Sequence, residues 1–326
     1  MTEDEALKRM KFPRDFRGNR KIFQIWVTRA CDKSCFGCTQ GSNIAGKPGM
    51  ITIEQYEQAV KSMQGYPGVI AMFGGNPCLH PDFEELCEIA RAYIPYRQRG
   101  IWTNNLFGRG KVCRATFNPA MSNFNVHLDQ EAAAEFRRDW PETKSMLKGL
   151  NHDCSHSPMF VAMKDLDKLP FPDGTWRENT EENRWELISN CDINQKWSAM
   201  IGVFRGELRG WFCEIAGSQS MLHQNDPNYP DTGLPVVPGW WKRPPEDFYD
   251  QVRKHCHECG APCRGIGDLA VNGTREQVSL THLEIYKPKQ RGREVELVHR
   301  VDQLGRSVPH VTDYLANYRY QGEDNS

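Results

Sequence analysis

Three closely spaced cysteines follow an apolar run near the start of the chain. Cys31, Cys35 and Cys38 form the pattern C-x-x-x-C-x-x-C after the run from Ile22 to Val27. Three thiolates on one short loop can ligate three corners of a [4Fe–4S] cube and leave the fourth iron without a protein ligand. An iron that is open at one corner can bind a small molecule. A zinc ion is the rival interpretation, but structural zinc takes four protein ligands, usually from paired cysteine elements.

A second group of cysteines stands in the last third of the chain. It consists of a lone cysteine, a cysteine after a predicted hairpin, a long gap and a C-x-x-C pair, which are Cys191, Cys213, Cys256 and Cys259. Cys263 is an additional thiol close to the pair. Either these residues ligate a second iron–sulfur cluster, or Cys256, Cys259 and Cys263 form a zinc knuckle with His255 or His257.

The remaining cysteines are isolated in the sequence, at Cys78, Cys87, Cys113 and Cys154. Isolated free cysteines commonly behave as small buried hydrophobes, and we expect this role here. Cys78 is the one that we expect nearest to a functional cavity.

Elements that could position the first cysteine group alternate along the chain. We expect strands over residues 21–27, 69–73, 100–103, 123–128 and 159–163, and helices over 52–63, 84–93, 130–138 and 143–150. This alternation implies a parallel sheet with crossover helices. Residues 20–190 are therefore predicted to form an α/β barrel or half-barrel, in which functional groups lie at the carboxyl ends of the strands.

The pattern changes after Cys191. Residues 198–204 and 208–212 predict a β-hairpin with Gly206 in the turn. Residues 224–245 are rich in Pro, Gly, Asn and Asp and predict an irregular loop, followed by a helix over 245–255. We expect four parts: an N-terminal extension over 1–20, the barrel portion over 21–190, a second domain over 191–285 and a polar tail over 286–326.

The composition excludes several classes of protein. The 326 residues carry a formal net charge of −1, so no overall field favours nucleic acid. No apolar stretch approaches the roughly 20 residues that span a bilayer, and the first residues are charged. We therefore expect a cytoplasmic protein, without membrane association. The 12 cysteines are then expected to serve metals or catalysis, because a reducing compartment disfavours disulfides.

The cysteine loop resembles that of the radical S-adenosylmethionine (radical SAM) superfamily. The resemblance rests on residues 29–38, with the aromatic Phe36 between the last two cysteines. It extends to Gly74, Gly75, Asn76 and Pro77 at the end of the second predicted strand, where the family usually has Gly-Gly-Glu-Pro, and more weakly to Thr103 and Asn104. These residues and Phe36 are implied to bind SAM. His127 or Asp129, at the end of the fourth predicted strand, is a further candidate to face the cavity, and we expect His127 to contact SAM. Asn76 departs from the family's glutamate, since an amide accepts a hydrogen bond but offers no charge.

The resemblance implies a fold, a set of cofactors and a reaction. The fold is a partial (β/α)6 TIM-like barrel, followed by a small domain whose cysteine order is similar to the twitch form of the SPASM extension. The cofactors are a [4Fe–4S] cluster with one open iron, SAM, and an auxiliary [4Fe–4S] cluster. The implied reaction is reductive cleavage of SAM to a 5′-deoxyadenosyl radical, which takes hydrogen from a substrate, with a flavodoxin or ferredoxin as electron donor.

Several alternatives remain open for the reaction. Cys263 could replace an auxiliary ligand or give a hydrogen atom to a substrate radical, so that the outcome is epimerisation, dehydrogenation or rearrangement. Only twenty residues precede Lys21, which leaves no room there for a peptide-recognition domain. A carbohydrate, cyclitol or nucleoside-like small molecule is therefore favoured over a peptide. A non-catalytic iron–sulfur or zinc protein is the remaining alternative.

Overall fold

The computed structural model describes residues 1–16, 22–33, 35, 38–42, 49–151, 159–196, 198–263, 275–286 and 294–300. The strands are β1 (Ile22–Thr28), β2 (Val69–Gly74), β3 (Arg99–Thr103), β4 (Asn123–Asn125), β5 (Leu147–Lys148), β6 (Lys168–Pro170), β7 (Trp176–Glu178), β8 (Ser198–Phe204), β9 (Glu207–Trp211), β10 (Leu234–Pro235), β11 (Arg275–Val278) and β12 (Glu294–Leu297). The α-helices are α1 (Glu3–Arg9), α2 (Ile53–Ser62), α3 (Phe83–Tyr93), α4 (Gly110–Thr116), α5 (Gln130–Asp139), α6 (Glu181–Ser189), α7 (Asp192–Lys196), α8 (Glu214–Leu222), α9 (Tyr249–His255) and α10 (Leu283–Tyr286).

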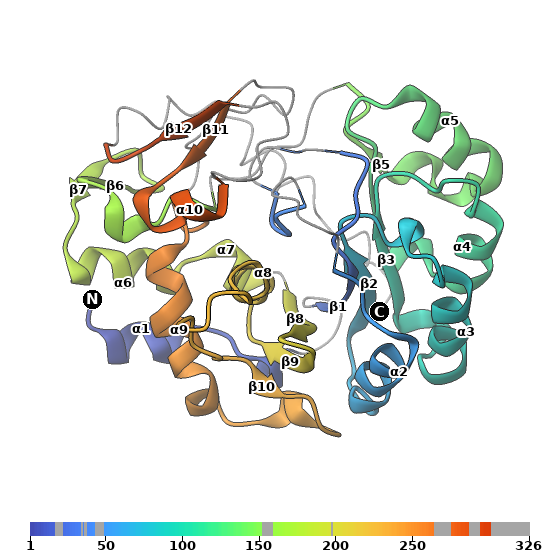
Figure 1. Cartoon of the computed structure of the whole chain (residues 1–326), viewed down its shortest axis with the longest axis horizontal. Helices are drawn as coiled ribbons and strands as arrows, with labels where there is room; N and C mark the ends of the chain where they lie inside the picture. The colour runs from blue at the N-terminus through green and yellow to red at the C-terminus, as the bar shows by residue number, and fades with distance from the viewer. Residues whose placement is uncertain are drawn as a thin grey trace, which may run out of the picture.

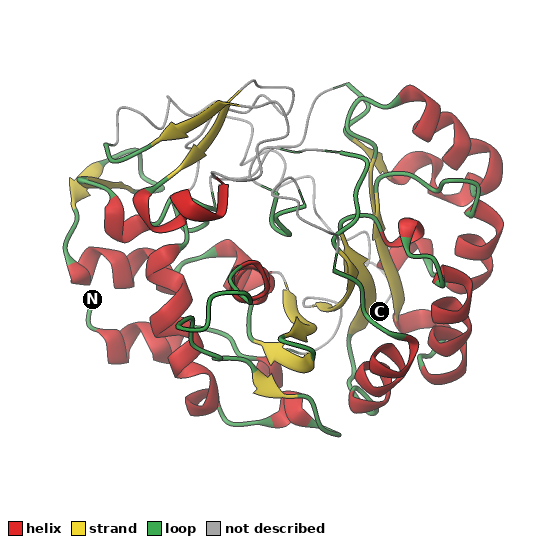
Figure 2. Ribbon diagram, viewed as in Figure 1, coloured by secondary structure: helices red, strands yellow, loops and turns green. Residues whose placement is uncertain are grey.

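One mainly parallel sheet organises the molecule. Its strand order is β10-β9-β8-β1-β2-β3-β4-β5, and every neighbouring pair from β8 to β5 is parallel. The strands β9 and β10 continue the sheet in antiparallel fashion. Helices α2, α3, α4 and α5 lie along one outer side of this sheet (Figures 1 and 2). The mixed α/β class and the parallel sheet are thus confirmed, while closure into a partial barrel stays a prediction.

The first strand and helix form for reasons that the sequence makes visible. All seven residues of β1 are buried, as its run of apolar residues predicts. Helix α2 begins with a capping box: the Gln55 N–H donates to Thr52 Oγ1 at 3.2 Å, and the Thr52 N–H donates to Gln55 Oε1 at 3.1 Å. The resulting strand–loop–helix unit holds the N-terminal cysteines between two well-defined elements.

The predicted helix over residues 143–150 is wrong. A 3₁₀ helix (Pro141–Met146) occupies its first part, and the strand β5 follows at once. Leu147 and Lys148 pair with Phe124 and Asn125 of β4. Pairing with the sheet therefore prevails over the local helical pattern, as tertiary context often does.

The predicted strand over residues 159–163 is also wrong. Met159 and Phe160 form a turn, and Met163 begins a 3₁₀ helix (Met163–Asp165). The side chains of residues 159–163 are buried, as expected for the predicted strand. The backbone, however, forms hydrogen bonds with Ser279 instead of with a neighbouring strand: the Ala162 N–H donates to Ser279 Oγ at 2.8 Å, and the Ser279 N–H donates to the Phe160 carbonyl at 3.1 Å. A short apolar run does not distinguish a strand from other buried backbone.

The fourth strand is shorter than the predicted range of 123–128. It ends at Asn125, and His127 and Leu128 have φ angles of 46° and 63°. Backbone in the left-handed region cannot continue a strand. His127 therefore belongs to the loop beyond β4 rather than to the strand itself.

The predicted hairpin exists, and it belongs to the main sheet. Its first arm, β8, pairs in parallel with β1, and its second arm, β9, pairs with β8. Gly206 lies in the connecting turn with a φ of 86°. The sheet thus continues across the predicted domain boundary at residue 190, and one buried apolar cluster includes residues from both sides of it. The four-part division remains a prediction.

No helix in the described ranges is long and apolar enough to cross a membrane.

Candidate functional site

The N-terminal cysteines lie where four parallel strands end. The loop after β1 carries Cys31, Cys35 and Cys38, and all three are partly buried. The neighbouring strands β2, β3 and β4 end at the segments that were predicted to contact SAM. Phe36 lies outside the described residues.

Two glycines let the segment after β2 pass close to the cysteine loop. The Gly75 N–H donates to the Thr28 carbonyl at 2.8 Å, and the Asn76 N–H donates to the Ala30 carbonyl at 2.7 Å. A Cβ atom at Gly75 would lie 2.3 Å from the Ala30 oxygen, and one at Gly74, where φ is 147°, would lie 2.2 Å from the Thr28 oxygen. Only glycine fits at both positions, because the ends of β1 and β2 almost touch.

Asn76 is fully buried and uses its whole amide within the protein. Its Oδ1 accepts hydrogen bonds from the Cys78 N–H and from Thr103 Oγ1, both at 2.9 Å. Its Nδ2 donates to Asn104 Oδ1 and to the Asn105 carbonyl, both at 2.9 Å. Asn76 therefore ties the end of β2 to the end of β3. Pro77 follows as the first residue of a 3₁₀ helix (Pro77–Leu79).

Residues from the ends of β3 and β4 reach the cysteine loop. Cys31 Sγ lies 4.0 Å from Asn104 Oδ1, and Asn104 Nδ2 donates to Asp32 Oδ1 at 2.7 Å. Cys35 Sγ lies 3.7 Å from His127 Nε2. The structure therefore brings Asn104 and His127 to the thiols, although the two residues were singled out for SAM.

Charged side chains surround the loop. Lys33 Nζ lies 2.6 Å from Asp129 Oδ2 and 3.2 Å from Asp32 Oδ2. Asp129 also caps helix α5, because its side chain accepts a hydrogen bond from the Ala132 N–H. This residue therefore has a structural role at the start of the helix. Arg29 is buried; burial lowers the pKa of its guanidinium to about 10, and the neighbouring Cys38 opposes this shift. The cations of Arg29 and Lys33 can offset the charge of ligating thiolates.

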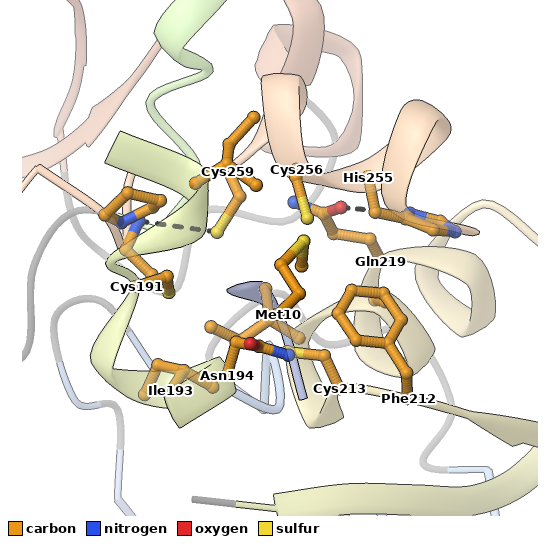
Figure 3. Close-up of a pocket in the computed structure, with 15 residues that line it drawn as sticks. Met10, Cys191, Ile193, Asn194, Phe212, Cys213, Gln219, His255, Cys256 and Cys259 are labelled. Carbon is orange, nitrogen blue, oxygen red and sulfur yellow. Dashed lines mark hydrogen bonds between the residues drawn. The ribbon is translucent and has the colours of Figure 1, made fainter. Parts of the chain in front are cut away.

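The four C-terminal cysteines converge on one pocket (Figure 3). Cys191 directly precedes α7, Cys213 directly precedes α8, and Cys256 and Cys259 lie at either end of a short turn after α9. The rest of the wall is largely apolar and includes Ile188, Ile193, Ile215, Ala216, Ala261 and Pro262. The structure thus assembles the group that cysteine order predicts, from chain segments that are far apart in sequence.

The chemistry of this pocket favours a cationic centre. Burial raises the pKa of the Cys213 thiol to about 12, and it also raises the pKa values of Cys256 and Cys259. Mutual repulsion among the thiolates raises these pKa values further. The thiols of Cys213, Cys256 and Cys259 become good ligands only when a metal centre compensates the charge of their thiolates. The donor set and its apolar surroundings therefore fit a buried iron–sulfur cluster.

The histidines of the proposed zinc knuckle have other partners. His255 Nε2 lies 2.9 Å from Thr232 Oγ1, and its Nδ1 lies 3.1 Å from Gln219 Oε1. His257 Nδ1 accepts a hydrogen bond from Arg184 Nε at 3.2 Å. Within the described ranges, no three side chains of His, Cys, Asp or Glu are arranged to hold a metal ion, and this finding covers the two cysteine groups as well as the knuckle.

Cys263 lies beside the pocket. It is 1% exposed, and in the described part of the chain it is not among the lining residues. Burial raises the pKa of its thiol, and the charge of the Cys191 thiolate raises it further.

A buried carboxyl group, which sequence reasoning missed, connects the two cysteine regions. Glu214 is the first residue of α8, and Ser198 Oγ donates to its Oε2 at 2.6 Å. The side chains of Gln24 and Thr39 also form hydrogen bonds with this carboxyl group, and burial raises its pKa to about 7. Thr39 directly follows the N-terminal cysteine group, so one side chain contacts segments beside both groups. The feature of the sequence that could have pointed to Glu214 is its position directly after Cys213.

Comparison with known proteins finds a weak structural likeness. No protein-family model matches the chain, and no curated protein matches it. Among solved structures the chain is similar to BtrN, described as "Crystal structure of BtrN in complex with AdoMet and 2-DOIA", at 16% identity and a TM-score of 0.31. The match covers 39% of this chain and 54% of that chain, so it spans about half the length of BtrN.

Proposed function

We propose that the chain is a radical SAM enzyme whose first [4Fe–4S] cluster is held by Cys31, Cys35 and Cys38. When bound, the cluster and SAM supply a 5′-deoxyadenosyl radical that removes hydrogen from a substrate C–H bond. The observation that carries the proposal is the position of the three thiols: they lie on one loop at the end of β1, against polar groups from the ends of β2, β3 and β4.

The surrounding residues have separable roles in this proposal. Gly74 and Gly75 bring backbone groups close to the cysteine loop, where an amino acid moiety can be held. Asn76 orients Thr103 and Asn104 through buried hydrogen bonds and thereby acts on SAM indirectly. Thr103, Asn104 and His127 supply the polar side chains that are proposed to contact SAM. Pro77 and Phe36 are proposed to contact it as well.

The second group of cysteines is proposed to hold an auxiliary [4Fe–4S] cluster through Cys191, Cys213, Cys256 and Cys259. If that cluster were to take one electron from the substrate radical while the substrate lost a proton, the net reaction would be an oxidation. If Cys263 were to donate a hydrogen atom instead, the reaction would be an epimerisation, and the thiyl radical left on Cys263 would need one electron, from the proposed flavodoxin or ferredoxin, and one proton to return to the thiol. The proposed substrate is a carbohydrate, cyclitol or nucleoside-like molecule, with a modified peptide as the alternative, and the proposed reductant is a flavodoxin or ferredoxin.

An electron carrier is the second candidate function, and one contact favours it. His127 lies 3.7 Å from Cys35 Sγ, where its imidazole could complete the cluster as a fourth protein ligand. Such a cluster would have no open iron for SAM. His127→Ala distinguishes the two functions, because it should remove a ligand from a carrier but leave a SAM-binding cluster with three thiolates.

The test is anaerobic reconstitution followed by incubation with SAM and dithionite. We expect 5′-deoxyadenosine, measured by mass spectrometry, from the wild type and from a Cys87→Ala control, which removes a buried thiol outside both groups. The triple variant Cys31→Ala/Cys35→Ala/Cys38→Ala should form none and should lose about four of about eight iron atoms per chain. If the wild type binds iron at these thiols without forming 5′-deoxyadenosine, the carrier function is correct instead.

A further inference from the structure

The N-terminal segment, residues 1–16, packs against the pocket of the C-terminal cysteines. Helix α1 contacts α6, which ends just before Cys191. Met10 follows α1 and lines the pocket together with the four cysteines. Figure 3 shows its side chain directed into the space that the cysteines surround. A residue from the start of the chain thus contributes to a site whose ligands lie more than 180 positions away.

Hydrogen bonds attach this segment to the helix after Cys191. The Lys11 N–H donates to Asn194 Oδ1 at 2.9 Å, and Asn194 Nδ2 donates to the Lys11 carbonyl at 2.8 Å. Gln195 Nε2 donates to the Arg9 carbonyl at 3.1 Å. These bonds use the backbone on both sides of Met10, so they fix where its side chain enters the pocket.

The same segment contacts the other two chain segments that carry cysteines. The ring of Phe12 lies 5.9 Å from that of Phe212, which directly precedes Cys213, and 5.8 Å from that of Tyr249 in α9. Glu3 forms an ion pair with Arg253 of α9 at 2.7 Å, three residues before Cys256. The N-terminal segment therefore contacts all three parts of the chain that meet at the pocket.

The chemistry of Met10 suits a cover rather than a fifth ligand. Its side chain is 3% exposed, apolar and flexible, and its thioether is only a weak hydrogen-bond acceptor. The apolar shell around a metal site controls solvent access and the local dielectric, which tune both the reduction potential and the stability of a cluster. A polar or missing side chain at this position would admit water and dioxygen.

We infer that residues 1–16 are a built-in cover for the auxiliary cluster, and that Met10 is the positioning residue that seals its pocket from solvent. The inference rests on the proposed function only for the identity of the cluster. No sequence motif indicates a role for this N-terminal segment.

The test uses the Cys31→Ala/Cys35→Ala/Cys38→Ala background, in which only the auxiliary cluster can contribute absorbance near 400 nm. In this background Met10→Ala should accelerate bleaching by air on the order of tenfold, since it opens the outer shell of the site. Met10→Leu, which keeps an apolar side chain of similar size, should bleach at nearly the background rate. Leu7→Ala is the matched control, because Leu7 is buried in α1 but does not line the pocket in the described part of the chain.

The outcomes separate this inference from the proposed function. Suppose that Met10→Ala and the background bleach at equal rates and each bind about four iron atoms per chain. The inference that Met10 shields the cluster is then wrong, while the proposed auxiliary cluster is still supported. Equal acceleration by Met10→Ala and Leu7→Ala also overturns the role of Met10, because general loosening would then explain it. A background protein with no bound iron overturns the auxiliary cluster and the cover together.

Discussion

The two cysteine regions are built in different ways. The N-terminal group comes from eight consecutive positions on one loop, is partly exposed and is surrounded by polar and charged groups. The C-terminal group comes from three separated segments and lines a largely apolar pocket, and Met10 of the N-terminal segment lines the same pocket. A loop of the first kind can present an open iron to a small polar molecule, whereas a pocket of the second kind favours a fully ligated, sheltered centre. Under the proposed function, the same thiolate ligands have different roles because their surroundings differ.

We expect the largest effect from removing one of the proposed ligands in the C-terminal pocket. Cys256→Ser should abolish the auxiliary cluster, so that iron falls from about eight to about four atoms per chain. Thermal stability should fall as well, because metal binding and folding are coupled where a site joins distant segments. Cleavage of SAM to 5′-deoxyadenosine should continue. Parallel loss of SAM cleavage in this variant, but not in Cys87→Ala, would show that the two regions are not independent.

A second variant addresses the close approach at the N-terminal region. Gly75→Ala would place a Cβ atom 2.3 Å from the Ala30 carbonyl, so the cysteine loop must shift. A displacement of this size should lower the rate of SAM cleavage on the order of 10²-fold. Gly206→Ala is the control, because its φ of 86° brings strain of about 1 kcal/mol but no atom lies within 4 Å of the added Cβ. A normal rate for Gly75→Ala would contradict the importance of this contact.

A third variant tests the network that joins β2 to β3. Asn76→Asp replaces the Nδ2 donor with an oxygen and sets it against Asn104 Oδ1 and the Asn105 carbonyl. Each buried acceptor left without a donor costs about 1–3 kcal/mol in the free energy of unfolding, which anaerobic urea titration measures. The apparent SAM affinity, from binding titrations, should weaken in the same variant because Asn104 loses its orientation. Unchanged stability with weakened SAM binding would instead indicate direct contact between Asn76 and SAM.

The smallest expected effect is a pH dependence near the same strand ends. His80 is buried: its Nδ1 accepts the Asp82 N–H at 3.1 Å, and its Nε2 lies 3.0 Å from the Ile51 carbonyl. Burial lowers the pKa of His80 below its ordinary value of 6.5. The neutral form is therefore favoured by folding, and stability that is fully present above about pH 6.5 is lost as the pH falls below it. His80→Gln should flatten the slope of unfolding free energy against pH below about pH 6.5. An unaltered slope would mean that other histidines cause it.

Much of the parallel α/β portion was predictable because its signals are local. The buried run of β1, the capping box of α2 and the glycines after β2 each occupy a few consecutive residues, and each element formed where it was expected. The errors fell on residues 143–150 and 159–163, where local pattern competed with partners distant in sequence. Leu147 joined the sheet, and the turn at Phe160 found its hydrogen-bond partner at Ser279. Helix α4 was not predicted at all.

By itself, the amino-acid sequence determined the two cysteine groups and the polar segments that follow the strands, because ligand spacing and residue type are written along the chain. Only the tertiary structure decided that β8 pairs beside β1, that Asn76 turns its amide to the end of β3, that Glu214 lies between the two regions and that Met10 enters the C-terminal pocket. The physical reason is that burial and hydrogen-bond pairing are set by whole-chain packing. The residues adjacent to a side chain in the sequence do not indicate which distant residues it will contact in the folded protein.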